Sequence, residues 1–329
     1  MTDFDYRHPI AWREPSALRL DPEVADFLEH WIEQLVRGVE VPHHNERAQH
    51  EAMCRRIHHQ LECGSGAMRH DSACLEQLDA ASFRRVFDQI CSGLGMPVPI
   101  DLEGRTTKEV RDAGKKDSKL APARGHMTNQ ELAFHSDRAD LTVLACWQPA
   151  AEGGQFRITS SSALLRDLER DAPAWWPWLS RAIPHDLRDE SSTTDRGWCE
   201  LPLFSGAGND FALRYIRKFN ESTIRHGVTL PPEVCEMLDD IDARLEAPGA
   251  SVEVAFRRGV FVIVNNHTTL HARRAFRDSD GAPTRCLLRS WLSSPFTRAL
   301  PLAWTPVFHD VRPGAWRGGV LGSEMEATT

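Results

Sequence analysis

The chain lacks the sequence features of a secreted or membrane-embedded protein. Its eight cysteines are scattered and form no C-x-x-C pair, so a disulfide framework is not indicated. The first residues lack the basic start and apolar core of a signal peptide. No uncharged stretch approaches the length of a membrane span. A reducing cytoplasm is therefore the location that the sequence predicts.

The chain also lacks an excess of positive charge. A net charge of -8 and a pI of about 6.0 provide no global field that would attract DNA, RNA or an anionic membrane. The 329 residues, with 41% hydrophobic and 26% charged side chains, are ordinary for a soluble globular protein with a sizeable core. This balance favours an enzyme that acts on a small-molecule substrate.

The first hundred residues are predicted to be helical. Asp21 and Pro22 form a cap pair, after which apolar residues recur at helical spacing over 24–35. A second helix is predicted over about 45–62. A third carries the apolar residues of 83–94 and ends near Gly93 and Gly95. The polar, aperiodic segment 104–119 is interpreted as a surface loop.

From about residue 128 onward, short apolar runs separated by turn residues predict strands. The expected strands are 131–135, 141–147, 155–160, 211–216, 252–257, 259–265 and 286–292. Helices are expected over about 162–170 and 231–245. Helices followed by strands indicate an α+β chain with a mainly β core, a sandwich or jelly roll flanked by helices. Without an internal repeat or a linker, residues 1–329 are predicted to form one domain.

A histidine and an aspartate stand two residues apart in F-H-S-D-R, as His135 and Asp137. The H-x-D triplet is weak evidence by itself, because roughly one is expected by chance. Here it follows a strand-like run, and alternation with period two places both side chains on one face. A surface histidine beside a surface aspartate is the alternative.

Two further histidines, His267 and His271, follow the apolar run 260–265. Either could be the third ligand of a metal, or both could be structural. We favour His271 because Arg285 follows it by fourteen residues. Two imidazoles and one carboxylate are the facial triad of non-haem Fe(II), which leaves positions open for chemistry. The planar fork of an arginine suits the carboxylate of a bound cosubstrate.

From about residue 125 to 295 the chain resembles the taurine dioxygenase / clavaminate synthase-like superfamily of Fe(II)/2-oxoglutarate-dependent oxygenases. The matching stretches are T-N-Q-E-L-A-F-H-S-D-R-A-D, A-E-G-G, N-N-H-T-T-L-H-A-R-R-A-F and R-C-L-L-R-S-W-L. The last two, at their mutual distance, are the most specific. The resemblance implies a distorted double-stranded β-helix (jelly roll) as catalytic core over about 125–295. The first hundred residues match no motif and are treated as a helical N-terminal region.

The resemblance also implies roles for individual residues. His135, Asp137 and His271 would bind iron as the catalytic set, and Arg285 would pair with the distal carboxylate of 2-oxoglutarate. The cofactors would be Fe(II), 2-oxoglutarate and O2, with release of succinate and CO2. Halogenating members lack the carboxylate ligand, so Asp137 favours hydroxylation of an unactivated C–H bond.

One position departs from the pattern of the family. Many relatives carry a threonine two residues after the Gly-Gly pair, where it helps to hold the cosubstrate carboxylate. In this chain the position is Phe156. We therefore expect the second donor nearby, with Thr159 as the candidate and Ser160 as its neighbour.

Four residues are candidates for substrate binding. Arg289 lies four residues beyond Arg285, so in a strand both point to one face, and the resemblance implies that Arg289 contacts an acidic group. The substrate would be an amino acid or another small carboxylic acid. A local ion pair is the alternative for Arg289.

The other three candidates are less specific. Asn129 and Glu131 share strand parity with His135 and are expected in the same pocket, where Glu131 could bind a substrate ammonium or orient His135. Arg217, next to Arg214 and Tyr215, could bind an acid, although solvated surface arginines are the alternative. The polar segment 186–198 is either a lid or a surface loop.

Two other functions remain as alternatives to a hydroxylase. A non-catalytic binding protein of the same fold would carry a vestigial iron site, although such a site has no reason to retain all four residues. A zinc hydrolase can use two histidines and a carboxylate, but it gives Arg285 no role. No nucleic acid or membrane partner is expected, and the sequence leaves homo-oligomer formation open.

Overall fold

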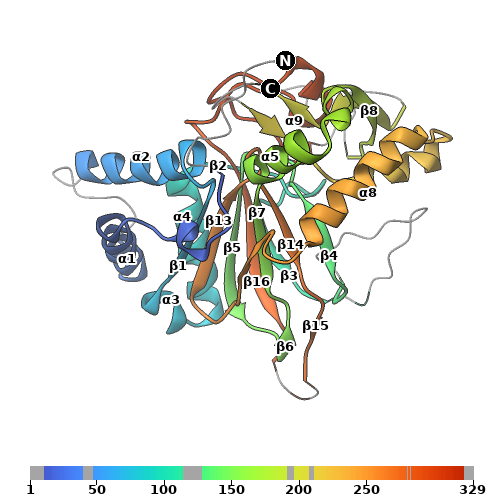
Figure 1. The fold of residues 1–329 in the computed structure, drawn as a ribbon. Coiled ribbons are helices and arrows are strands. Elements are labelled where there is room, and N and C mark those ends of the chain that lie inside the picture. The colour runs from blue at the N-terminus through green and yellow to red at the C-terminus, as the bar shows by residue number, and fades with distance from the viewer. Residues whose placement is uncertain are drawn as a thin grey trace.

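The computed structural model describes residues 11–39, 47–112, 114, 128–190, 196–206, 211–279, 281 and 283–321. At its centre lie two antiparallel sheets (Figure 1). The N-terminal helices lie on one side of the sheets, and α8 (Pro232–Glu246) lies on the other. The mixture of helices and antiparallel strands confirms the predicted class.

The N-terminal helices begin and end close to the predicted positions. After the 3-10 helix η1 (Pro15–Leu18), α1 (Pro22–Val36) begins at Asp21, whose side chain accepts from the backbone N–H of Glu23. Such caps satisfy amides that have no partner within the helix. The helices that follow are α2 (Arg47–Cys63), α3 (Ala73–Glu76) and α4 (Ala80–Leu94).

The expectation of an exclusively helical N-terminal region is wrong, and so is that of a loop over 104–112. Residues 113 and 115–119 of the expected loop lie outside the described residues. Strands β1 (Ala67–Asp71) and β2 (Met96–Val98) flank α3 and α4 in the chain, and β3 (Thr107–Val110) lies inside the expected loop. These strands have mixed polarity and three to five residues each. Sequences this short give no usable alternation, and their pairing with distant strands decides their conformation.

The larger sheet has the order β1-β13-β5-β16-β2, and β3 also pairs with β16. Its long strands are β5 (Leu141–Gln148), β13 (Val260–Asn265) and β16 (Cys286–Ser293). Alternate residues on its outer face, including Val143 and Ile263, pack against Ile32 of α1 and Phe87 of α4. The sheet and the N-terminal helices therefore share one apolar core.

The smaller sheet has the order β12-β7-β14-β4. Its strands are β4 (Leu132–His135), β7 (Phe156–Ser160), β12 (Val252–Val254) and β14 (Thr269–Arg273). Phe156 and Ile158 pack with Leu144, Val262 and Leu287 of the larger sheet in one buried cluster. The inner faces of the two sheets therefore meet, as in a sandwich.

The outer face of the smaller sheet is covered by α5 (Ser161–Asp171) and α8. Leu165 of α5 and Ile241 of α8 share a buried cluster with Phe134 and Leu270 of the sheet. The remaining described elements are β6 (Glu152–Gly153), η3 (Pro173–Trp175), α6 (Trp176–Leu179), β8 (Ala182–Asp186), β9 (Trp198–Pro202), β10 (Phe204–Ser205), β11 (Ala212–Leu213), α7 (Arg217–Glu221), η5 (Ser222–His226), β15 (Phe276–Arg277), η6 (Leu302–Trp304) and α9 (Thr305–Phe308).

Most of the predicted strands are confirmed to within two residues. The strands expected over 211–216 and 252–257 are shorter, at Ala212–Leu213 and Val252–Val254. Strand β14 was not predicted from the sequence. His271 lies inside this strand. Within the described residues, no helix has the length and apolar character needed to cross a membrane.

A buried ionic network joins the C-terminal segment to the ends of the central strands. Asp140 Oδ1 lies 2.8 Å from Arg317 Nε and 2.8 Å from His267 Nε2. The backbone N–H of Ser294 donates to Asp140 Oδ2. Burial raises the pKa of the Asp140 carboxyl. The hydrogen bond from His267 and the charge of Arg317 lower it by more, so the net shift of this pKa is downward. Asp140 is therefore a charged anchor.

We expect Asp140→Asn to lower the free energy of unfolding by about 3 kcal/mol, because it leaves the buried Arg317 without its counter-charge. Urea unfolding of the metal-free protein measures this loss. Since the pKa of Asp140 is lowered when the protein is folded, its contribution is present at neutral pH and disappears as the pH falls through that pKa. Asp310→Asn, which removes a partner of the exposed Arg312, should leave the unfolding midpoint nearly unchanged. A loss below about 1 kcal/mol for Asp140→Asn would contradict the anchor.

Candidate active site

Strand pairing in the smaller sheet brings the three candidate metal ligands together. His135 ends β4 and is the Cα partner of His271 in β14, and their rings lie 4.4 Å apart. Asp137 follows two residues after His135, with Oδ1 3.8 Å from His135 Nε2 and Oδ2 3.6 Å from His271 Nε2. One ligand atom from each residue lies within 4.8 Å of the others, and all three side chains are buried. The structure thus places the predicted set in one position.

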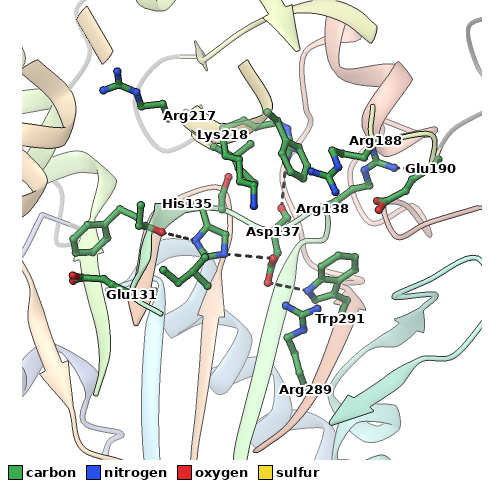
Figure 2. A pocket seen from close by; sticks show the side chains of 17 residues that line it. Glu131, His135, Asp137, Arg138, Arg188, Glu190, Arg217, Lys218, Arg289 and Trp291 are labelled. Carbon is green, nitrogen blue, oxygen red and sulfur yellow. Dashed lines mark hydrogen bonds and ion pairs between the residues drawn. The ribbon is translucent and has the colours of Figure 1, made fainter. Parts of the chain in front are cut away.

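The carboxylate of Asp137 is oriented by donors from several elements. Thr142 Oγ1 donates to Asp137 Oδ2 at 2.8 Å. Trp291 Nε1 donates to the same oxygen at 2.9 Å (Figure 2). The backbone N–H of Asp137 donates to Asn266 Oδ1, and Asn266 Nδ2 donates to Thr142 Oγ1. Both side-chain donors act on Oδ2, which leaves Oδ1 suited to a metal.

The electrostatics of the site favour the forms that bind metal. Burial raises the pKa of Asp137, but the charge of Arg289 and the hydrogen bond of His271 outweigh it, so its pKa lies well below the usual value. Burial lowers the pKa of His135 to about 4, with repulsion from His271 as the next cause. A carboxylate and neutral imidazoles are the protonation states that bind metals.

The tautomer of His135 is also fixed. Its Nδ1 donates to the carbonyl oxygen of Ala133 at 2.9 Å, which leaves Nε2 without its proton and available to a metal. His271 packs against the ring of Phe156, with centroids 5.4 Å apart. Two imidazoles and one carboxylate in this arrangement fit an Fe(II) facial triad.

A cavity of ≈ 260 Å³ opens beside His135 and Asp137. Its walls include Phe219 and Trp291, and Glu190 contributes one acidic group. The basic residues that line it are Arg138, Arg188, Arg214, Arg217, Lys218 and Arg289 (Figure 2). The cavity therefore carries an excess of positive charge.

Arg289 of β16 and Arg285, the residue just before that strand, point to the inner face, as their even spacing predicted. Arg289 lines the cavity near Asp137, and its guanidinium carbon lies 5.1 Å from the ring centre of Trp291. Arg285 is 2% exposed, and its guanidinium carbon lies 4.7 Å from the ring centre of Phe276. Its Nη1 is buried and has no hydrogen-bond partner among the described residues.

Burial lowers the pKa of Arg285 to about 10, so the group is still charged at neutral pH. A buried cation with an unsatisfied N–H group is the environment that a carboxylate ligand would complete. Gly154 permits the close approach of this side chain, because a Cβ at that position would lie 3.2 Å from Arg285 Nε. The site therefore fits the distal carboxylate of 2-oxoglutarate.

The side chain of Glu131 does not point toward His135 as predicted, because a β-bulge reverses the parity of β4. His135 pairs with His271 and Leu132 pairs with Arg273, so three steps on β4 oppose two steps on β14. Glu131 lies at the rim of the cavity, half exposed, and its carboxylate accepts from Arg274 Nη1 at 3.1 Å. Its side chain therefore turns to the outer face, away from His135.

Asn129 precedes β4, is exposed and is absent from the cavity lining. Its carbonyl oxygen accepts from the backbone N–H of Phe276. Residues 128–130 form bends instead of continuing the strand, so alternation along β4 does not extend to Asn129. Its assignment to the substrate pocket is wrong.

Thr159 is not available as a donor to the cosubstrate. It is the Cα partner of Leu270, whose side chain belongs to the outer cluster, and its Oγ1 donates to the carbonyl oxygen of Ala250 at 2.6 Å. Phe156 instead shares the inner face with His271. The prediction for Thr159 failed because an odd number of residues separates it from the inward position 156.

The two arginines around Tyr215 have different environments from those predicted. The guanidinium of Arg217 points away from His135 (Figure 2) and binds the carboxylates of Glu221, Asp239 and Asp242. These ion pairs give no support to its assignment to substrate binding, although Arg217 lines the cavity. Arg214, for which a solvated surface position was the alternative, is instead 2% exposed, and its Nη1 donates to the carbonyl oxygen of Asp137 at 3.4 Å.

The ligand choice between His267 and His271 favours His271. The Nε2 of His267 is hydrogen-bonded to Asp140 Oδ1, so His267 has a structural role. The polar segment 186–198 joins β8 to β9, and Arg188 and Glu190 from it line the cavity. Residues 191–195 of that segment lie outside the described residues.

Several site residues had no signal in the sequence. Thr142, Asn266 and Trp291 lie 5 to 154 residues from Asp137, and their hydrogen bonds become visible only once the sheets are assembled. The same holds for Arg138, Arg188 and Lys218 in the cavity wall. The basic character of the cavity is a property of the fold, since the chain as a whole is acidic.

Comparisons with known proteins agree with this geometry. A family model described as "Taurine catabolism dioxygenase TauD, TfdA family" matches residues 9–291. FR-33289 synthase of Streptomyces rubellomurinus (strain ATCC 31215) is 27% identical over 247 residues, which are 74% of this chain and 73% of the relative.

Solved structures show the same fold. Asparagine oxygenase in complex with Fe(II), 2S,3S-3-hydroxyasparagine and succinate superposes with a TM-score of 0.60 at 16% identity, over 84% of this chain and 93% of that chain. The non-haem iron oxygenase OrfP in complex with Fe and alpha-ketoglutaric acid gives a TM-score of 0.57 at 15% identity, with coverages of 84% and 93%.

The family match extends over most of the chain. It includes the three candidate metal ligands and both Arg285 and Arg289. The resemblance predicted from the motifs is therefore confirmed. The chain belongs to the TauD/TfdA family of taurine catabolism dioxygenases, and it is an oxygenase that depends on Fe(II) and 2-oxoglutarate.

Proposed function

We propose that this enzyme hydroxylates an unactivated C–H bond of a small carboxylic acid, most simply an amino acid, and releases succinate and CO2. The observation that carries the proposal is the convergence of His135, Asp137 and His271 beside a cavity with basic walls. In this proposal the two sheets form the distorted double-stranded β-helix of the family. The N-terminal helices, which share a core with the larger sheet, belong to the same domain.

We propose that His135, Asp137 and His271 hold the iron. Iron and 2-oxoglutarate, when bound, supply the oxidising chemistry that the side chains of a protein cannot provide. The protein contributes ligand orientation: Ala133 fixes the Nε2 of His135, and Thr142 and Trp291 hold one oxygen of Asp137. Arg285 would pair with the distal carboxylate of the cosubstrate.

The charge of the cavity supports an acidic substrate. Arg289 lies beside Asp137 and Trp291 in the wall, so a substrate carboxylate bound there would place the adjoining carbon atoms close to the metal ligands. Solved relatives of the same fold contain hydroxylated asparagine and (3S)-hydroxy-L-Arg, and both are amino acids. The cavity volume of ≈ 260 Å³ is suited to a molecule of this size.

We expect Asp137→Ala to abolish succinate formation from 2-oxoglutarate and to weaken Fe(II) binding, because a facial triad loses its only anionic ligand. Anaerobic metal titration and succinate assays measure the two effects. Glu131→Gln is the matched control, because it alters a carboxylate that faces Arg274 on the outer side of the sheet, and it should retain activity. Normal turnover by Asp137→Ala would overturn the ligand assignment.

Metal exchange separates the proposed oxygenase from a zinc hydrolase with the same ligands. After removal of metal by a chelator, Fe(II) should restore succinate formation and Zn(II) should not, since the reaction requires a redox-active metal. Consumption of O2 should accompany turnover in the Fe(II) sample. Activity that Zn(II) restores without O2 would favour the hydrolase.

We expect Arg289→Gln to raise the KM for the organic acid substrate by roughly 10- to 100-fold, the effect of losing a charge-assisted hydrogen bond of about 1.5–3 kcal/mol. The apparent affinity for 2-oxoglutarate should change little. Steady-state kinetics with each substrate varied in turn measures both. Arg217→Gln is the control, because the guanidinium of Arg217 is bound by three carboxylates. An unchanged KM in Arg289→Gln would remove Arg289 from the substrate site.

A further inference from the structure

A second buried arginine lies beside Arg285. Arg273 is in β14, two residues after His271, and is 4% exposed. Its guanidinium carbon lies 4.9 Å from the ring centre of Phe276, and that of Arg285 lies 4.7 Å from the same ring. Two positively charged side chains therefore share one aromatic neighbour in the interior.

The two guanidinium groups have no carboxylate partner among the residues that the structure describes. Among the described residues, no ion pair involves Arg273 or Arg285. The hydrogen bonds of Arg273 run from its Nη2 to the carbonyl oxygens of Thr128 and Gln130. Arg273 Nε and Arg285 Nη1 are buried and have no acceptor within the described part of the chain.

Two neighbouring buried cations are unfavourable unless an anion completes the site. A carboxylate has two oxygen atoms and can accept from more than one N–H group. Arg273 also occupies the right place on the sheet, because it is the Cα partner of Phe156 on the adjacent strand β7. The side chain of Phe156 has no hydrogen-bond donor. The hydroxyl of Thr159 donates to the carbonyl oxygen of Ala250 on the other face of the sheet.

We propose that Arg273 is a second cosubstrate-binding residue, which acts with Arg285 on the distal carboxylate of 2-oxoglutarate. The inference rests on the proposed role of Arg285 in the cosubstrate site. It assigns to a neighbouring guanidinium the contribution that Phe156 and Thr159 do not make. The other role for Arg273 is purely structural, through its bonds to the carbonyl groups of Thr128 and Gln130.

The test compares two 2-oxo acids that differ in the distal carboxylate. Binding of 2-oxoglutarate and of 2-oxobutyrate is titrated anaerobically against the Fe(II)-loaded protein, without organic substrate. We expect Arg273→Gln to raise the Kd of 2-oxoglutarate by roughly 10- to 100-fold, the scale of a charge-assisted bond. The Kd of 2-oxobutyrate, which lacks the distal carboxylate, should stay within about threefold.

Two further variants control for charge and for folding. Arg274→Gln removes the adjacent arginine, which pairs with Glu253 and Glu131 on the outer face, and should leave both Kd values unchanged. Arg273→Lys keeps the positive charge, so it should preserve more of the preference for 2-oxoglutarate than Arg273→Gln does. Thermal unfolding of each variant identifies those that are folded, and Arg273→Lys carries the test if Arg273→Gln is not.

The outcomes distinguish this inference from the proposed function. If the Arg273 variants raise the Kd values of both acids equally, or change neither Kd, Arg273 is structural and the inference is overturned. If the wild-type protein does not prefer 2-oxoglutarate, or if Arg285→Gln retains that preference, the proposed cosubstrate site itself fails. Selective loss of 2-oxoglutarate binding in both Arg273→Gln and Arg285→Gln supports the shared carboxylate site.

Discussion

The register between β4 and β14 is the constraint on which the site depends. His135 and His271 are direct partners across these two strands, which is why their rings lie 4.4 Å apart. A shift by one residue would turn one imidazole to the opposite face of the sheet. The bulge between Leu132 and His135, which precedes the pair in β4, changes the register there without disturbing the pair. The geometry of the ligands is thus set by backbone hydrogen bonds before any metal binds.

The hydrogen bonds of Asp137 depend on the packing of the two sheets against each other. Asp137 comes two residues after β4 of the smaller sheet, but its donors Thr142 and Trp291 belong to β5 and β16 of the larger sheet. A buried carboxylate without such donors would favour its neutral form. Contact between the two inner faces therefore supplies the hydrogen bonds that keep the ligand charged. Packing changes between the sheets will reach the metal site through these two side chains.

The sequence was sufficient for the residues whose positions follow from strand pattern and motif spacing. The H-x-D triplet and the fourteen-residue step to Arg285 identified His135, Asp137 and His271, which the structure brings together. Alternation placed Arg285 and Arg289 on one face. The failures arose where alternation itself was interrupted or counted from the wrong residue.

The bulge turned Glu131 to the outer face, and odd spacing from Phe156 did the same for Thr159. The prediction for Arg217 gained no support for a different reason, because two of its carboxylate partners, Asp239 and Asp242, come from α8, and no local pattern predicts that contact.

An acidic chain that concentrates buried or half-buried cations around one site must recover their desolvation cost from ligands. Arg289 lies near the metal ligands, whereas Arg285 and Arg273 gather around Phe276. The two groups of positive charge lie at different places on the inner faces, which suits one acid as substrate and a second acid as cosubstrate.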